Sequence, residues 1–276
     1  MVMKDYPIRV EGSEVYAKLR VYLWENSPEI VSERKPLILM CPGGGYVMTS
    51  DREADPIAFQ FLAMGMSVAI LRYSVAPAEY PVALLELATA MKMIKEHSEE
   101  WFVDEDKIFL QGCSAGGHLA ASFGMFWHEN WIGERVGIAP EKLKPAGMIL
   151  CYPVITSGEK AHRGSFEALL KSQYTEEMLE RTSLEKQVTE HTPPAFIWHT
   201  YTDDTVPVEN SLMLIQAMKE YDISVEFHMY PIGGHGLSTS DDIAIDTRNF
   251  GYQKECQSWI PLVKTWLAGK TGINAN

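Results

Sequence analysis

The sequence predicts an α/β protein whose central sheet is mostly parallel and carries helices on both faces. The first observation is a series of short, continuous apolar runs, which indicate strands that are buried on both sides. The second is that amphipathic, helix-like stretches alternate with these runs, an order typical of parallel sheets. The third is size, because 276 residues with 46% hydrophobic side chains can bury a large core.

The first predicted strand, residues 15–23, alternates strictly between apolar and polar side chains, as expected for a sheet edge with one solvated face. A polar, proline-bounded loop follows at 27–36. Further predicted strands cover 37–41, 67–71, 107–111, 146–151, 195–199 and 225–230. Helices are predicted from Pro81 onward and over 55–64, 118–127, 209–221 and 248–267.

One polar and charged segment, residues 157–194, interrupts this alternation and is helix-prone at 166–170 and 176–181. Sheets of this kind bind ligands at the carboxyl ends of their strands. We therefore expect a single domain, residues 1–276, with a small lid-like insertion at about 157–194 over the site at these strand ends.

The charge balance excludes several classes of partner. A net charge of −13 provides no basic footprint for nucleic acid or for an anionic membrane. The four cysteines lie far apart and form no CxxC pair, so we expect neither a metal site nor a cofactor. The first residues contain no apolar run typical of a signal peptide, and no stretch is long enough to span a bilayer. These features predict a cytoplasmic protein with a small-molecule substrate, and they allow a homo-oligomer.

A candidate nucleophile stands in Gly112-Cys113-Ser114-Ala115-Gly116, which fits the G-x-S-x-G pattern. The motif follows a predicted strand and precedes a predicted helix, which is the setting of a nucleophile elbow. Glycines are needed at both ends because a Cβ there would clash with the neighbouring strand and helix. A serine that only caps the helix is the alternative interpretation, and the strand–turn–helix context favours the nucleophile.

A second glycine-rich turn, Pro42-Gly43-Gly44-Gly45-Tyr46, leaves a predicted strand. Its glycines can turn backbone N–H groups into a pocket, as an oxyanion requires. We predict that the donors are Gly44, Gly45 and Ala115, the last being the residue after the nucleophile. A phosphate cradle is disfavoured, because no Lys-Ser or Lys-Thr pair follows and G-x-G-x-x-G does not fit.

Among eight histidines, His235 alone lies in a glycine-flanked loop just after a predicted strand, so it is the predicted general base. His199 lies in a predicted core strand, where a hydrogen-bonded structural histidine is expected. The orienting acid should lie between nucleophile and base in the chain. Asp203 is the preferred candidate and Asp204 the alternative, since both follow the strand at 195–199.

With these motifs, the chain resembles the α/β-hydrolase superfamily, and within it small acetyl and carbohydrate esterases near the hormone-sensitive-lipase branch. The resemblance covers nearly the whole chain from about Lys35. It is carried by Cys41–Tyr46, Arg72-Tyr73, Tyr80-Pro81, Gly112–His118, Thr192–Pro194, Asp203–Pro207 and Gly234–Gly236. One departure is Pro42, which stands where the branch usually has histidine.

The resemblance implies a serine esterase that hydrolyses short-chain acyl esters, with acetylated sugars or xylan fragments as the implied substrates. Esters and amides are cleaved by the same triad, so an amide- or peptide-cleaving hydrolase is the alternative. A binding protein without catalysis is disfavoured, because such proteins typically lack a triad member and here serine, histidine and acid are all present.

Overall fold

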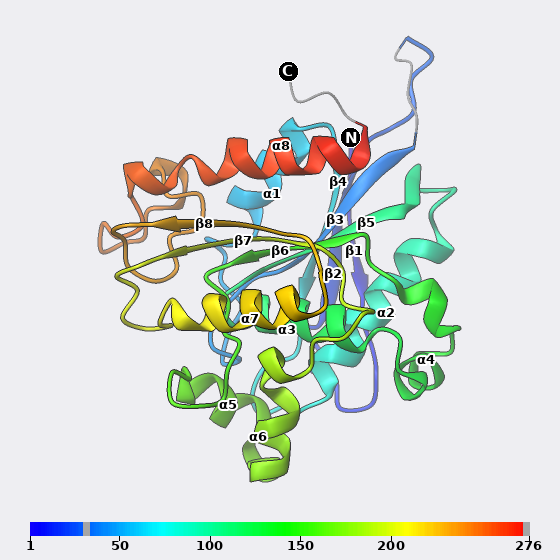
Figure 1. The fold of residues 1–276 in the computed structure, drawn as a ribbon. Coiled ribbons are helices and arrows are strands. Elements are labelled where there is room, and N and C mark those ends of the chain that lie inside the picture. The colour runs from blue at the N-terminus through cyan, green and yellow to red at the C-terminus, as the bar shows by residue number, and fades with distance from the viewer. Residues whose placement is uncertain (30–33, 273–276) are drawn as a thin grey trace.

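The computed structural model describes residues 1–29 and 34–272, so part of the predicted loop at 27–36 lies outside the described residues. Eight strands form one sheet in the order β1-β2-β4-β3-β5-β6-β7-β8 (Figure 1). β1 and β2 pair antiparallel, β2 also runs antiparallel to β4, and all remaining neighbours are parallel. The predicted α/β fold class with a mostly parallel sheet is therefore confirmed. The strands are β1 Val2–Pro7, β2 Lys18–Leu23, β3 Lys35–Cys41, β4 Ser67–Arg72, β5 Val103–Cys113, β6 Gly147–Cys151, β7 Ala195–Thr200 and β8 Val225–Tyr230.

Helices cover both faces of this sheet (Figure 1). α1 (Asp55–Ala63) and α8 (Trp259–Thr271) pack on one face, where Phe61 and Trp259 are fully buried. α2 (Val82–Glu96), α3 (Ala115–Phe126) and α7 (Glu209–Glu220) pack on the other. Because helices cover both faces, β3 to β7 contribute buried side chains to both hydrophobic cores. This explains why the sequences of these strands are continuous apolar runs.

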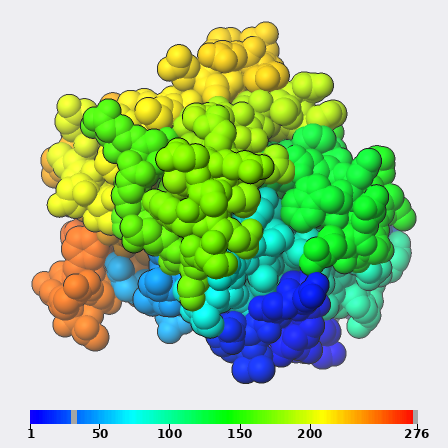
Figure 2. All heavy atoms as spheres, turned by 90° about the horizontal axis from the view of Figure 1, so that it is seen from below, coloured from blue at the N-terminus to red at the C-terminus, as the bar shows by residue number. Residues whose placement is uncertain are grey.

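The segment between β6 and β7 folds as short helices, α5 (Arg163–Leu170) and α6 (Glu176–Thr182), joined and followed by the 3₁₀ turns Lys171–Gln173 and Leu184–Lys186. These helices lie below the α2, α3 and α7 layer in Figure 1. Figure 2 looks at the molecule from that side and shows the segment as the lime-green surface at its centre. One side of the segment at 157–194 is therefore exposed to solvent.

The structure departs from the expected elements at three places. The predicted helix at 248–267 is wrong in its first half, since α8 begins at Trp259. There the Asp246 carboxylate accepts the N–H groups of Arg248 and Phe250, both at 2.9 Å, and Gly251 has φ 122°, so the chain turns instead. Neither β1 nor a short helix, α4 (Asn130–Val136), was expected. β1 occupies the sheet edge that was predicted for the strand at 15–23, so that prediction is wrong in its position.

The carboxyl ends of the parallel strands meet along one edge of the sheet. The glycine-rich turn at residues 42–46, called the glycine loop below, follows β3. The candidate serine follows β5, and the candidate acid and base follow β7 and β8. Four segments that are distant in the sequence are therefore brought to one place by the sheet topology. None of the described helices combines the length and apolar content needed to cross a bilayer.

Candidate active site

Ser114 occupies a strained turn between β5 and α3, with φ 54° and ψ −121°. Positive φ is uncommon for a residue with a Cβ and is a feature of functional turns. A Cβ on Gly116 would lie 2.0 Å from the carbonyl oxygen of Cys41, and one on Gly112 would lie 2.2 Å from the carbonyl oxygen of Gly116. Only glycine fits at these two positions, for the steric reason that the sequence suggests.

His235 reaches the serine from the loop that follows β8. Its Nε2 lies 2.7 Å from Ser114 Oγ, which is hydrogen-bonding distance. Gly233 and Gly236, with φ 146° and 75°, give the loop the backbone angles that bring the imidazole back over the sheet edge. The side chain of His235 is 16% exposed, so the imidazole borders solvent while the serine is largely covered.

The carboxylate of Asp203 forms a hydrogen bond with the other ring nitrogen of His235, Nδ1. Its Oδ2 accepts from His235 Nδ1 at 2.7 Å, and its Oδ1 accepts the N–H groups of Thr205 and Val206 at 3.0 and 2.9 Å. Burial alone would raise the pKa of Asp203, but the hydrogen bonds from His199 and His235 and from the backbone bring the pKa below its ordinary value. Asp204 is exposed, and its carboxylate contacts the Thr205 hydroxyl rather than His235.

His199 also touches the buried carboxylate, at 3.3 Å from Asp203 Oδ2. Its Nε2 donates to the carbonyl of Val206 at 2.9 Å, and its Nδ1 lies 2.8 Å from the hydroxyl of Ser211. The imidazole is fully buried, and the same Nε2 lies beside both the Val206 carbonyl and the carboxylate of Asp203. The sequence indicated a hydrogen-bonded structural histidine at this position but not its contact with the acid.

The glycine loop lies directly against the nucleophile. A Cβ on Gly43 would come within 2.9 Å of Ser114 Cβ, and Gly44 and Gly45 have φ of 134° and 64°. Within the described part of the chain, no acceptor bonds to the backbone N–H of Gly44, Gly45 or Ala115. The three N–H groups expected to bind an oxyanion are therefore free to donate.

The segment at 157–194 faces this loop. A Cβ on Gly45 would lie 3.9 Å from Ser165 Oγ and 4.0 Å from His162 Cε1, so both side chains border the glycine turn. His162 Nδ1 pairs with Ser165 Oγ at 2.8 Å, and Nε2 has no partner among the described residues. Burial lowers the pKa of His162, and the nearby His235 lowers the pKa further.

Two further side chains join the glycine loop to its surroundings, and the sequence did not single them out. The buried Glu53 accepts the N–H of Gly43 at 2.8 Å and the hydroxyl of Tyr152 at 2.8 Å. Gly43 lies 10 residues from Glu53 in the chain and Tyr152 lies 99 residues away, so only the folded structure reveals these contacts. A carboxylate close after a glycine turn is a weak signal in a sequence.

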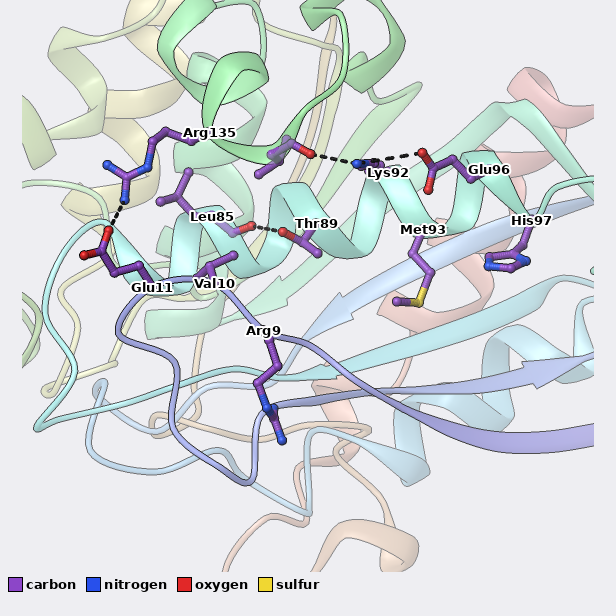
Figure 3. Close-up of a pocket in the computed structure, with 11 residues that line it drawn as sticks. Arg9, Val10, Glu11, Leu85, Thr89, Lys92, Met93, Glu96, His97 and Arg135 are labelled. Atoms are coloured by element: carbon purple, nitrogen blue, oxygen red, sulfur yellow. Dashed lines mark hydrogen bonds and ion pairs between the residues drawn. The ribbon is translucent and has the colours of Figure 1, made fainter.

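Another hollow, with a volume of about 530 Å³, lies between α2, α4 and the loop after β1 (Figure 3). None of the residues described above lines it. Its charged groups are already paired, Arg135 with Glu11 at 3.5 Å and Lys92 with the carbonyl of Val136 at 2.8 Å (Figure 3). The convergent polar groups expected of an active site are therefore at the strand ends and not in this hollow.

The four cysteines are buried free thiols. Within residues 1–29 and 34–272, no group of three or more His, Cys, Asp or Glu side chains is arranged to hold a metal ion.

Curated proteins that resemble the chain share parts of it. The chain is 34% identical to endo-1,4-beta-xylanase B of Butyrivibrio fibrisolvens over 76% of its own length but only 33% of that protein's length. It is 22% identical to esterase LipQ of Mycobacterium tuberculosis over 72% of its length and 49% of the relative's. The chain therefore spans about a third to a half of the length of these relatives.

Two solved structures resemble the chain over most or all of their length. An acetyl ester-xyloside bifunctional hydrolase from Caldicellulosiruptor lactoaceticus has a TM-score of 0.80 and 31% identity, with 94% of this chain and 89% of that chain covered. A carboxylesterase from Lactobacillus plantarum has a TM-score of 0.84 and 26% identity, with 100% of each chain covered. The family pattern named BD-FAE matches residues 26–218. The chain therefore belongs to the BD-FAE family and has the α/β-hydrolase fold that its motifs predict.

Proposed function

We propose that the chain is a carboxylic ester hydrolase that works by two-step acyl transfer through Ser114. The observation that carries this proposal is the continuous line of contacts from Ser114 Oγ to His235 to Asp203, with both intervening distances at 2.7 Å. A serine hydroxyl is a weak nucleophile unless a neighbouring base accepts its proton, and the base needs a third group to orient it.

In the first step, Ser114 Oγ attacks the ester carbonyl and its proton passes to His235 Nε2. Asp203 fixes the Nδ1–H tautomer and stabilises the imidazolium that forms. The oxyanion of the tetrahedral intermediate accepts from the N–H groups of Gly44, Gly45 and Ala115, each of which is worth roughly 3 kcal/mol in comparable sites. His235 then protonates the departing alcohol, which leaves an acyl-serine.

In the second step, water attacks the acyl-serine carbonyl while His235 takes its proton. Collapse of the second tetrahedral intermediate releases the carboxylic acid and returns the proton to Ser114. The free serine and the neutral imidazole are restored, so the cycle needs only residues of this chain and water.

The substrates that we propose are short-chain acyl esters of carbohydrates, such as acetylated sugars or xylan fragments. Two relatives support this choice, since one is a xylanase and the other acts on an acetyl ester and a xyloside. The segment at 157–194 would form one wall of the pocket, where the free Nε2 of His162 could bond a sugar hydroxyl beside Gly45. We propose residues 1–276 as one domain that contains this wall.

Initial rates on p-nitrophenyl acetate, butyrate and octanoate, beside an acetylated xylo-oligosaccharide, test the proposal, with Ser114→Ala as the control. Acetate release from the sugar and a steep fall in rate along the acyl series are expected. A preference for octanoate with the sugar untouched would exclude the carbohydrate substrates. Cleavage of an acyl anilide in preference to the matching ester would indicate the alternative, an amide-cleaving hydrolase.

A further inference from the structure

The carboxylate of Glu53 lies between the two loops that meet at Ser114. It is 4% exposed and follows the glycine loop in the chain, just before α1. Its Oε2 accepts the N–H of Gly43 at 2.8 Å, and its Oε1 accepts the hydroxyl of Tyr152 at 2.8 Å. Each carboxylate oxygen therefore binds a different segment of the active site.

Tyr152 extends this connection to the loop that carries the base. Its hydroxyl oxygen accepts the backbone N–H of Ser238 at 2.9 Å, so its own proton must point toward Glu53. The Tyr152 ring meets the His235 ring edge-on, with centroids 5.2 Å apart. The bonds run from Gly43 through Glu53 and Tyr152 to Ser238, three residues beyond His235.

The fit around Glu53 leaves little freedom for either loop. A Cβ on Gly43 would lie 2.6 Å from Glu53 Oε2 and 2.9 Å from Ser114 Cβ, so the Gly43 backbone is wedged between the carboxylate and the nucleophile. On the other side, a Cβ on Gly236 would lie 3.8 Å from Glu53 Oε1. A shift of this carboxylate would therefore displace the glycine loop relative to Ser114.

Both groups that bind Glu53 are donors, and this decides which side chain suits the position. A carboxylate presents an acceptor to each donor, whereas a glutamine of the same shape presents one acceptor and one NH₂ group. The NH₂ group would face either the Gly43 N–H or the Tyr152 hydroxyl. Among the described residues, no basic side chain forms an ion pair with Glu53. The hydrogen bonds to Gly43 and Tyr152 are therefore the polar contacts through which Glu53 acts on its surroundings.

We propose that Glu53 is a positioning residue. It fixes the glycine loop and the loop after β8, which carries His235, relative to each other around Ser114. This inference rests on the proposed function, because it assigns Glu53 a part in the same acyl transfer. The oxyanion donors Gly44 and Gly45 directly follow the residue that Glu53 holds, and catalysis depends steeply on where such donors lie.

The test compares Glu53→Gln with the wild-type chain and with Glu86→Gln. Glu86 is a matched control, since it is fully buried and accepts from Ser74 N–H and from the hydroxyls of Ser13 and Ser74, outside the active site. We expect Glu53→Gln to lower kcat on p-nitrophenyl acetate by about 10- to 100-fold, with KM changed less than about threefold. Glu86→Gln should keep kcat while lowering thermal stability.

A trifluoromethyl ketone, which forms an oxyanion-bearing adduct with an active serine, provides a readout that a purely structural role would not change. Its inhibition constant should rise in Glu53→Gln by the same factor by which kcat/KM falls. If Glu53→Gln does not fold, Tyr152→Phe replaces it, because it removes the Glu53–Tyr152–Ser238 bonds and keeps the ring. The same proportional change, of smaller size, is then expected.

An inhibition constant that stays at the wild-type value in the tested variant would overturn the inference, as would an equal loss of kcat in Glu86→Gln. Failure of the proposed function is distinguishable, because Ser114→Ala would then retain activity or the wild type would hydrolyse no ester. A wild type that needs Ser114, combined with an unaffected Glu53→Gln, refutes the role of Glu53 alone.

Discussion

Asp203 illustrates how single residues are specialised in this site. Its fully buried carboxylate faces two backbone N–H groups and two imidazoles. These donors outweigh burial and keep its pKa below the ordinary value, which favours the carboxylate form in the folded chain. Its neighbour Asp204 is exposed and bonds to neither histidine.

We therefore expect Asp203→Asn to be far more damaging than Asp204→Asn. The asparagine cannot hold His235 in the Nδ1–H tautomer as a carboxylate does, and a comparable change in another triad enzyme lowers kcat about 10⁴-fold. Asp204→Asn should leave kcat within about twofold. The kcat values of both variants on p-nitrophenyl acetate decide which aspartate is the acid. The reverse ranking would assign this role to Asp204.

At the scale of elements, the turn into α3 is constrained by backbone contacts on both sides. Gly116→Ala would place a Cβ 2.0 Å from the Cys41 carbonyl, so β3 and α3 would have to separate. In α8, Gly269 has no heavy atom within 4 Å of a Cβ built on it. We expect Gly116→Ala to destabilise the fold by more than about 2 kcal/mol and Gly269→Ala to stabilise it by about 1 kcal/mol. Urea unfolding measures both, and equal effects would contradict the account of the turn.

The segment at 157–194 should influence substrate choice more than chemistry. His162→Ala removes an imidazole beside Gly45 but none of the groups that take part in acyl transfer. We expect kcat/KM on p-nitrophenyl acetate to stay within about threefold. On an acetylated xylo-oligosaccharide it should fall about 10-fold, the value of one lost hydrogen bond. Competition between the two substrates measures the ratio, and an unchanged ratio would remove His162 from the pocket wall.

Elements were predictable where local patterns determine them. The strands β3 to β8 and the helices α1, α2, α3 and α7 lie within a few residues of their predicted positions, because apolar runs and amphipathic stretches are local features of the sequence. β1 was not predicted, since most of its side chains are exposed. The start of α8 was misplaced because an aspartate-centred turn at Asp246 competes with the helix, and this turn depends on the fold around it.

For the candidate site, the sequence predicted residues next to strand ends, and the structure brings Ser114, Asp203 and His235 within hydrogen-bonding distance of one another. Their motifs are local and carry a recognisable spacing. The neighbouring side chains Glu53, Tyr152 and His199 were not predicted to contact the site, because their partners lie elsewhere in the sequence. Such contacts leave no periodic or spaced pattern in a sequence.

At the scale of the whole molecule, His118 couples stability to pH. It is buried in α3, accepts the Tyr46 hydroxyl at Nδ1 and donates from Nε2 to the carbonyl of Thr182, both at 2.8 Å. Burial lowers its pKa from 6.5 to about 4. The unfolded chain therefore binds a proton at a pH where the folded chain does not.

Stability due to His118 is complete above pH 6.5 and is lost as the pH falls toward 4, which amounts to about 3 kcal/mol. His118→Gln keeps an acceptor and a donor but no titrating group. We expect the free energy of unfolding of this variant to change less between pH 6.5 and 4 than that of the wild type, by about this amount. Urea denaturation at several pH values provides the comparison, and parallel pH profiles would contradict the assignment.

The central claim is that Ser114 is the nucleophile of an ester hydrolase, and the turnover of p-nitrophenyl acetate by Ser114→Ala tests it most directly. Ser122→Ala is the matched control, because Ser122 is another buried serine, located in α3. We predict a loss in kcat on the order of 10⁶-fold for Ser114→Ala, by analogy with another triad enzyme, and a change within about twofold for Ser122→Ala. Near-normal turnover by Ser114→Ala would contradict the account.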